Sequence, residues 1–199
     1  MKKTNLLLAT LLIIGPLSSI QSQDKFSKRK IANLKQEVSQ LVEQDKKMTQ
    51  VMIDKVFSFG ELGFQEFETS KYLSKILEEN GFDIEYQISG IPTSWLATWS
   101  NGEGGPTIAL GSDFDGVPST SQYPGVAYEK PVVEGAPGHG EGHNIGLPIV
   151  ITSAISIKKI MIENNINGTL VLWPGVAEEI LGAKAWYVRD GYFDNVDMC

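Results

Sequence analysis

The apolar positions in the first half of the chain recur at helical spacing. Between residues 25 and 47 the sequence is charged, and its apolar residues share one face: Ile31, Leu34, Val38, Leu41 and Val42. This pattern predicts an amphipathic helix. A second, short helix is predicted at 48–59. A third is predicted to have Thr69 as its N-cap and to stop at Asn80-Gly81.

Strand-like patterns follow, and helices then alternate with strands. Strands are predicted at 82–88, 95–99 and 106–110. After a long loop rich in Gly and Pro, the pattern predicts a helix at 148–164, a strand at 168–173 and a helix at 178–190. This order of elements predicts an α/β layered domain, in which a mixed sheet is flanked by helices.

The first residues have the pattern of a secretory signal peptide. Lys2 and Lys3 precede an apolar run at 6–14, which is followed by Gly15-Pro16 and small polar residues. The run is well short of the about 20 residues that a membrane-spanning helix needs. We therefore expect a signal peptide at 1–22, export to the periplasm or the medium, and no stable membrane anchor. A hydrophobic N-terminal helix of the fold is the alternative.

Composition narrows the classes of function. The 199 residues contain 17 Lys and Arg against 24 Asp and Glu, and the net charge of −7 makes nucleic-acid binding an unfavourable hypothesis. The single cysteine, Cys199, cannot close an internal disulfide. An apolar fraction of 42% is typical of a globular protein, and the length allows one domain or part of a larger one.

Two polar clusters precede the predicted helix at 148–164. Asp113 and Asp115 come just after a predicted strand, where ligand sites of α/β sheets gather, although a plain turn explains the pattern equally well. Residues 138–144 contain both histidines, His139 and His143, with Glu141 between them. The glycines of this stretch oppose a helix, so we expect a loop that holds Glu141 and His143 toward one point. A flexible surface loop with solvated histidines is the alternative.

The third polar cluster is the pair Glu178-Glu179, at the start of a predicted helix. Acidic residues in this place often only complement the helix dipole. Successive side chains point in different directions, however, so one carboxylate can bind an ion while the other accepts a proton. Metal-assisted hydrolysis requires this division of roles.

These clusters and residues 61–67 occur in the order and spacing of the M20 metallopeptidase/amidohydrolase family. The chain resembles this family from roughly residue 45 to residue 199, and in particular its aminobenzoyl-glutamate-utilisation and N-acyl-amino-acid hydrolase branch. The resemblance implies a metal-dependent hydrolase that cleaves an amide bond of an N-acyl amino acid or a short peptide.

The resemblance also implies roles for single residues. Glu178 corresponds to the general base, Asp115 to an aspartate that orients a ligating histidine, and His139 to a residue behind the ligands. The implied metal ligands are His143, Glu179 and Glu141, with Asp113 as a further candidate. Glu141 stands where this branch usually has Cys, and a carboxylate shifts the preference from Zn²⁺ toward Mn²⁺. The cofactor expected is therefore Zn²⁺ or Mn²⁺.

Family members are much longer than this chain, with an inserted dimerisation domain and further histidine ligands. We therefore expect an N-terminal amphipathic helix at 24–47, followed at 48–199 by the N-terminal part of a metallohydrolase catalytic domain that lacks the dimerisation domain. The chain is interpreted as truncated, and a homodimer is expected only for the full-length form. Hydrolysis by the 199 residues alone is not expected.

Two other functions are compatible with the sequence. The segment from Asp113 to Asp115 also resembles the nucleophile loop of haloacid-dehalogenase-type phosphatases, in which Asp113 would attack phosphorus. Lys184 and Asp190 or Asp194 only imitate the later residues of that family, and the histidine cluster stays unexplained. The second alternative is an exported domain that binds a metal or a peptide without turnover.

Overall fold

The computed structural model describes residues 26–199, in which helices and strands alternate. The helices are α1 (Lys28–Gln44), α2 (Lys46–Phe59), α3 (Phe67–Glu79), α4 (His143–Glu163) and α5 (Lys184–Arg189). The strands are β1 (Asp83–Tyr86), β2 (Trp95–Asn101), β3 (Thr107–Asp113) and β4 (Gly168–Gly175). The short 3-10 turns are η1 (Ile88–Gly90) and η2 (Glu178–Ile180). The signal peptide expected at 1–22 lies outside the described residues and stays a prediction, which the mass of the mature protein would test.

The strands form one mixed sheet in the order β1-β2-β4-β3, which confirms the predicted fold class. β1 pairs with β2, and β2 with β4, in antiparallel fashion, whereas β3 and β4 are parallel. Parallel neighbours need a crossover connection, and the long loop and α4 supply it. The carboxyl ends of β3 and β4 therefore lie side by side at one edge of the sheet.

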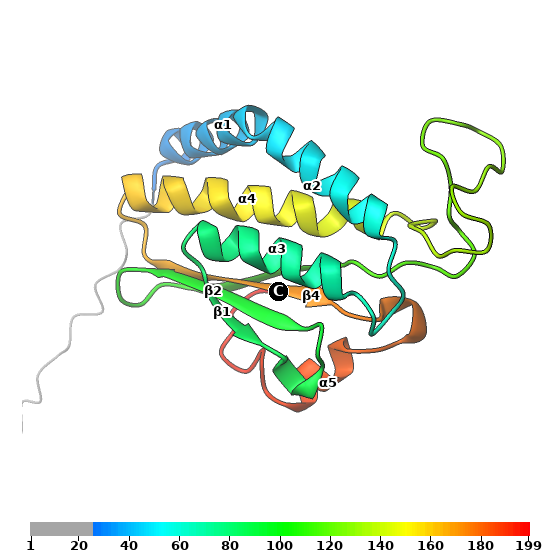
Figure 1. Ribbon diagram of the computed structural model, residues 1–199. Helices are drawn as coiled ribbons and strands as arrows, with labels where there is room; N and C mark the ends of the chain where they lie inside the picture. The colour runs from blue at the N-terminus through cyan, green and yellow to red at the C-terminus, as the bar shows by residue number, and fades with distance from the viewer. Residues whose placement is uncertain (1–25) are drawn as a thin grey trace, which may run out of the picture.

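The helices form two layers over one face of the sheet. α3 and α4 pack directly on the strands, and α1 and α2 lie over α4, while α5 lies on the opposite side of the sheet (Figure 1). The core between these layers is apolar and fully buried, with its largest side chains from α2, α3, β2, α4 and β4: Met52, Leu73, Leu77, Trp95, Leu147, Ile151 and Leu172. The long loop between β3 and α4 projects from the body near the start of α4 (Figure 1).

Helix α4 is apolar on nearly all sides. The sheet and the neighbouring helices pack against more than one side of it. It is the one helix among the described residues that is long and apolar enough to cross a membrane, with a mean hydropathy of 1.7. Half of that stretch is buried between the sheet and the outer helices. A helix that is hydrophobic all round is expected in such a central position.

The third helix begins earlier than predicted, and Thr69 is not its N-cap. α3 starts at Phe67, and Thr69 is buried in its first turn. The N–H groups of Glu68 and Thr69 donate instead to the Glu61 carboxylate, both at 2.9 Å. A residue outside the helix thus satisfies the free donors at its start, which a local capping pattern does not reveal.

Two later predictions of helix boundaries were also wrong. α4 begins at His143, five positions before the predicted start at Pro148, because the loop ends at Gly142 in a left-handed conformation with φ of 113°. The predicted helix at 178–190 is split into η2 and α5. Ala177 and Leu181 on either side of η2 have φ values of 54° and 58°, which a continuous helix does not permit.

Candidate metal centre

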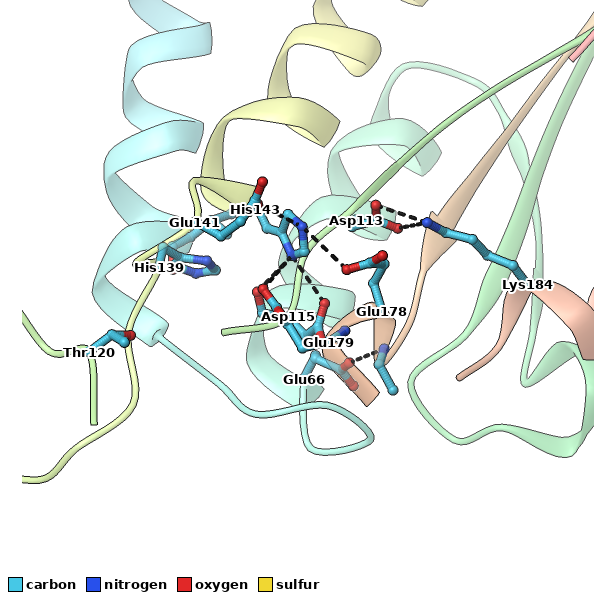
Figure 2. A network of polar contacts seen from close by, with 12 residues as sticks. Glu66, Asp113, Asp115, Thr120, His139, Glu141, His143, Glu178, Glu179 and Lys184 are labelled. Carbon is cyan, nitrogen blue, oxygen red and sulfur yellow. Dashed lines mark hydrogen bonds and ion pairs between the residues drawn. The ribbon is translucent and has the colours of Figure 1, made fainter. Parts of the chain in front are cut away.

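The three polar clusters meet at the carboxyl end of the parallel strand pair. Asp113 at the end of β3 lies opposite Gly175 at the end of β4, so the segments that follow both strands leave the sheet together. The first residue of α4, His143, lies at the same edge, and Figure 2 shows the acidic side chains around it. Residues that are distant in the sequence are therefore neighbours because the strands are parallel and in register.

His143 lies at the centre of the cluster and is oriented by Asp115. The Nδ1 atom of His143 lies 3.2 Å from Asp115 Oδ1 and 3.1 Å from the Asp115 carbonyl oxygen. The other carboxylate oxygen of Asp115 accepts the N–H of Glu179 at 3.0 Å, and Asp115 is only 1% exposed. A carboxylate that accepts from Nδ1 leaves Nε2 as the free nitrogen of the ring.

The Nε2 atom of His143 faces two other carboxylates. It lies 2.8 Å from Glu141 Oε2 and 3.8 Å from Glu178 Oε2, while Glu179 Oε1 lies 4.0 Å from Nδ1 (Figure 2). The structure thus brings Glu141, His143, Glu178 and Glu179 close together, while their roles stay predictions. Glu141 lies in the loop, and His143 begins the helix that follows it.

The donor atoms fit a divalent cation. One group of potential ligands is Glu141, His143 and Glu179, whose donor atoms all lie within 4.8 Å of one another. A second group, Asp113, His143 and Glu178, meets the same distance limit. Carboxylate oxygens and an imidazole nitrogen are ligands of Zn²⁺ and Mn²⁺, and converging carboxylates are stabilised by a cation between them.

Asp113 already has a counter-ion within the protein. Lys184 Nζ, at the start of α5, lies 2.7 Å from Asp113 Oδ1 and 3.0 Å from Oδ2. Gly175 makes this approach feasible, because a Cβ at that position would lie 1.7 Å from Asp113 Oδ1. Asp113 therefore lies at the site, but its carboxylate is shared with an ammonium group.

His139 lies beside the cluster, and one of its ring nitrogens bonds to α2. The side chain is 8% exposed, and its Nε2–H donates to the carbonyl oxygen of Val56 at 3.0 Å. Burial lowers the pKa of His139, so the neutral ring is favoured. This geometry links the histidine loop to α2 and leaves His139 outside both groups of potential ligands.

The two adjacent glutamates differ in environment. Burial raises the pKa of Glu179, the nearby His143 lowers it, and the other carboxylates of the cluster raise it. Glu178 is more exposed, with 37% of its side chain accessible against 27% for Glu179. A cavity of about 210 Å³ reaches Glu178 and is also lined by Leu181 and Lys184. Glu178 can therefore meet a molecule that enters from solvent.

Sequence reasoning gave no role to Glu66, although it lies in the motif at 61–67. Glu66 is fully buried, and its carboxylate accepts the Ala177 N–H at 2.9 Å and the Thr93 hydroxyl at 2.8 Å. Burial raises the pKa of Glu66 and outweighs these hydrogen bonds, which lower it. The motif at 61–67 was the one sequence feature that could have drawn attention to Glu66. It could not identify the hydrogen-bond partners Thr93 and Ala177, which are 27 and 111 residues away in the sequence.

Comparison with known proteins identifies relatives among hydrolases. No protein-family model matches the chain. Over 160 residues, 80% of this chain, it is 31% identical to a subunit of the p-aminobenzoyl-glutamate hydrolase of Escherichia coli K12, of which it covers 33%. It is also 31% identical over 139 residues to hippurate hydrolase of Campylobacter jejuni, again covering 33% of that protein. The chain thus spans about one third of the length of these curated relatives.

Solved structures show the same fold. A dinuclear metal-binding peptidase of the M20 family from Bacillus subtilis superposes with a TM-score of 0.64 and 24% identity, over 77% of this chain and 42% of that one. The mixed sheet with helices on its face is thus the fold that this chain shares with that peptidase. The chain is homologous to amidohydrolases and peptidases of the M20 family.

Proposed function

We propose that the protein is a metal-dependent amidohydrolase that cleaves the amide bond of an N-acyl amino acid or a short peptide. The observation that carries this proposal is the position of Glu178 beside the ligand group. Its Oε2 lies 3.8 Å from His143 Nε2, which also faces Glu141. Support for the substrate class comes from the relatives, whose names specify hydrolysis of p-aminobenzoyl-glutamate and of hippurate.

Glu141, His143 and Glu179 would hold the divalent ion. Asp115 fixes the ring of His143 from behind, and its hydrogen bond to the Glu179 N–H ties two of the three ligands to one buried carboxylate. A bound divalent ion would supply Lewis-acid chemistry, which polarises the scissile carbonyl and lowers the pKa of water. Two carboxylates and one imidazole are compatible with Zn²⁺ and with Mn²⁺.

Glu178 would transfer the proton. Its side chain is 37% exposed and its Oε2 lies 3.8 Å from His143 Nε2, so a water molecule held at the ligand group would lie within its reach. We propose that Glu178 accepts the proton of this water and then delivers it to the leaving nitrogen, as a general base and then a general acid. Glu179 is the less exposed of the two glutamates and would serve as a metal ligand. A ligand does not exchange protons during the reaction, so it needs less access to solvent.

The test is the variant Glu178→Gln, which keeps the shape of the side chain and removes its ability to accept a proton. In the full-length form, we expect metal content to stay near that of the wild type and kcat for acyl-amino-acid hydrolysis to fall by about 10²–10⁴-fold. Glu163→Gln, at the exposed end of α4, is the matched control and should retain full activity.

Three results would contradict the proposal. Wild-type turnover by Glu178→Gln would remove Glu178 from the mechanism. Stoichiometric metal binding by the full-length form without hydrolysis of any acyl-amino acid in a panel would favour a binding protein instead. Metal-dependent hydrolysis of phosphate esters that is lost in Asp113→Asn would favour the phosphatase alternative.

A further inference from the structure

The segment from Glu61 to Glu66, here termed the brace segment, contacts both loops that carry candidate site residues. On one side it meets the loop after β3. The Glu61 carbonyl oxygen accepts the Gly116 N–H at 2.7 Å, and Leu62 and Gly116 form an isolated parallel bridge. The position of Asp115, the neighbour of Gly116, is therefore set partly by the brace segment.

On its other side the brace segment meets the loop after β4. Glu66 Oε1 accepts the Ala177 N–H at 2.9 Å. Gly63 packs so closely against Ala177 that an added Cβ would lie 2.9 Å from its Cα and Cβ atoms. The two contacts fix the residue that directly precedes Glu178 and Glu179.

Ala177 needs such support because its backbone is unfavourable for a residue with a side chain. Its φ of 54° and ψ of 43° lie in the left-handed region, which non-glycine residues seldom adopt. Ala177 is fully buried, so its N–H has no water to replace the Glu66 oxygen. Without that acceptor the peptide is expected to turn toward another conformation, which would move Glu178 and Glu179 with it.

We propose that Glu66 is a positioning residue of the metal centre, which holds the Ala177 peptide so that Glu178 and Glu179 face His143. The proposal rests on the proposed function, because it assumes that this cluster binds a divalent ion. Glu66 itself touches neither ion nor substrate: its carboxylate lies in the core, where it also accepts the Thr93 hydroxyl.

Three variants separate positioning from a contribution to folding alone. Glu66→Met has a similar volume and removes the acceptor of the Ala177 N–H. Glu66→Gln keeps an oxygen for Ala177, and its amide can donate to the Thr93 hydroxyl oxygen. Thr93→Val removes only the other hydrogen bond of Glu66 and is the matched control, since it also disturbs the core but leaves the Ala177 contact intact.

Two readouts are measured well below the melting temperature on the full chain. Mn²⁺ affinity is measured by calorimetric titration, and amide hydrogen exchange of residues 176–182 is measured without metal. We expect Glu66→Met to bind Mn²⁺ about 10–100-fold more weakly, and Glu66→Gln and Thr93→Val to stay within about threefold of the wild type. Exchange of the Ala177 amide should be faster in Glu66→Met alone.

Other outcomes overturn the proposal. Equal loss of affinity in Glu66→Met and Thr93→Val, or unchanged exchange at Ala177 in Glu66→Met, would give Glu66 a structural role only. If the wild type binds no Mn²⁺ or Zn²⁺, the proposed function fails, and the exchange contrast still decides whether Glu66 holds the Ala177 peptide. Should Glu66→Met not fold, Gly63→Ala applies the same test from the other contact, because its Cβ presses on Ala177.

Discussion

Glu66 gives the stability of the fold a pH dependence of unusual sign for a carboxyl group. Burial raises its pKa above the ordinary value of 4.5. A carboxyl whose pKa is higher in the folded state stabilises the fold below the unfolded pKa, and this stabilisation is lost as the pH rises through the folded pKa. As the pH rises from 4 to 8, the neutral variant Glu66→Gln should therefore become more stable relative to the wild type.

The expected change is a gain in the free energy of unfolding of Glu66→Gln relative to the wild type at the higher pH, measured by urea unfolding at both pH values. Glu37→Gln, on the exposed surface of α1, is the control for loss of a charge. A constant difference between Glu66→Gln and the wild type at both pH values would show that ionised Glu66 is not penalised by burial.

Single residues of the cluster were predictable where the sequence itself places them in a short motif. His143 and Glu141 are two positions apart, and Glu178 and Glu179 are adjacent, so one strand end or loop brings each pair to the site. Glu66 was not predictable in this way. Nothing local distinguishes a carboxylate that becomes fully buried from one that stays in solvent, because the Ala177 N–H that it accepts comes from the far end of the chain.

At the scale of elements, one lysine links three of them. Lys158 of α4 donates to the Asn80 and Gly81 carbonyl oxygens at the end of α3, and its ammonium group lies 5.2 Å from the ring centres of both Phe82 and Trp99. Carbonyl groups at a helix end and aromatic faces both attract a cation. Partial burial lowers the pKa of Lys158.

Lys158→Met should lower the free energy of unfolding by about 1–2 kcal/mol, because the last carbonyls of α3 lose a charged donor. The adjacent Lys159→Met is the matched control. Lys159 pairs with Asp45 at 3.2 Å on the surface, where an ion pair contributes only about 0–1 kcal/mol. Thermal and urea unfolding check both variants, and equal losses would mean that the contact at the end of α3 adds nothing specific.

The kind and order of the helices and strands could be predicted from the sequence. The predicted boundaries were wrong where tertiary contacts determine where a helix begins or ends. The alternating pattern gave the mixed sheet and the helices on its face, since burial on one side imposes the period. The start of α3 depends on the Glu61 carboxylate. The break before α5 depends on left-handed residues that the close packing of Gly63 and Gly182 against Ala177 accommodates. Periodicity contains neither kind of information.

At the scale of the whole molecule, charge is distributed unevenly. Five carboxylates converge at one edge of the sheet, those of Asp113, Asp115, Glu141, Glu178 and Glu179, and they are paired with Lys184 and with the ring of His143 when it is protonated. A cluster of this kind opposes folding through repulsion between like charges, and a bound cation relieves it. Metal binding and folding are therefore expected to be coupled.

The last prediction follows from that coupling. Mn²⁺ or Zn²⁺ at about 100 times its dissociation constant should stabilise the fold by about 2.7 kcal/mol, a rise of roughly 5–10 °C in melting temperature. A chelator should reverse the rise. His143→Ala and Glu179→Ala should lose it, because each removes a ligand of the proposed group. His139→Ala should melt at a lower temperature without metal and still show most of the rise, because His139 contacts Val56 and not the ligands. Scanning calorimetry with and without metal measures all four proteins. A rise that persists in His143→Ala would place the ion elsewhere, and equal loss in all three variants would mean that His139 belongs among the ligands.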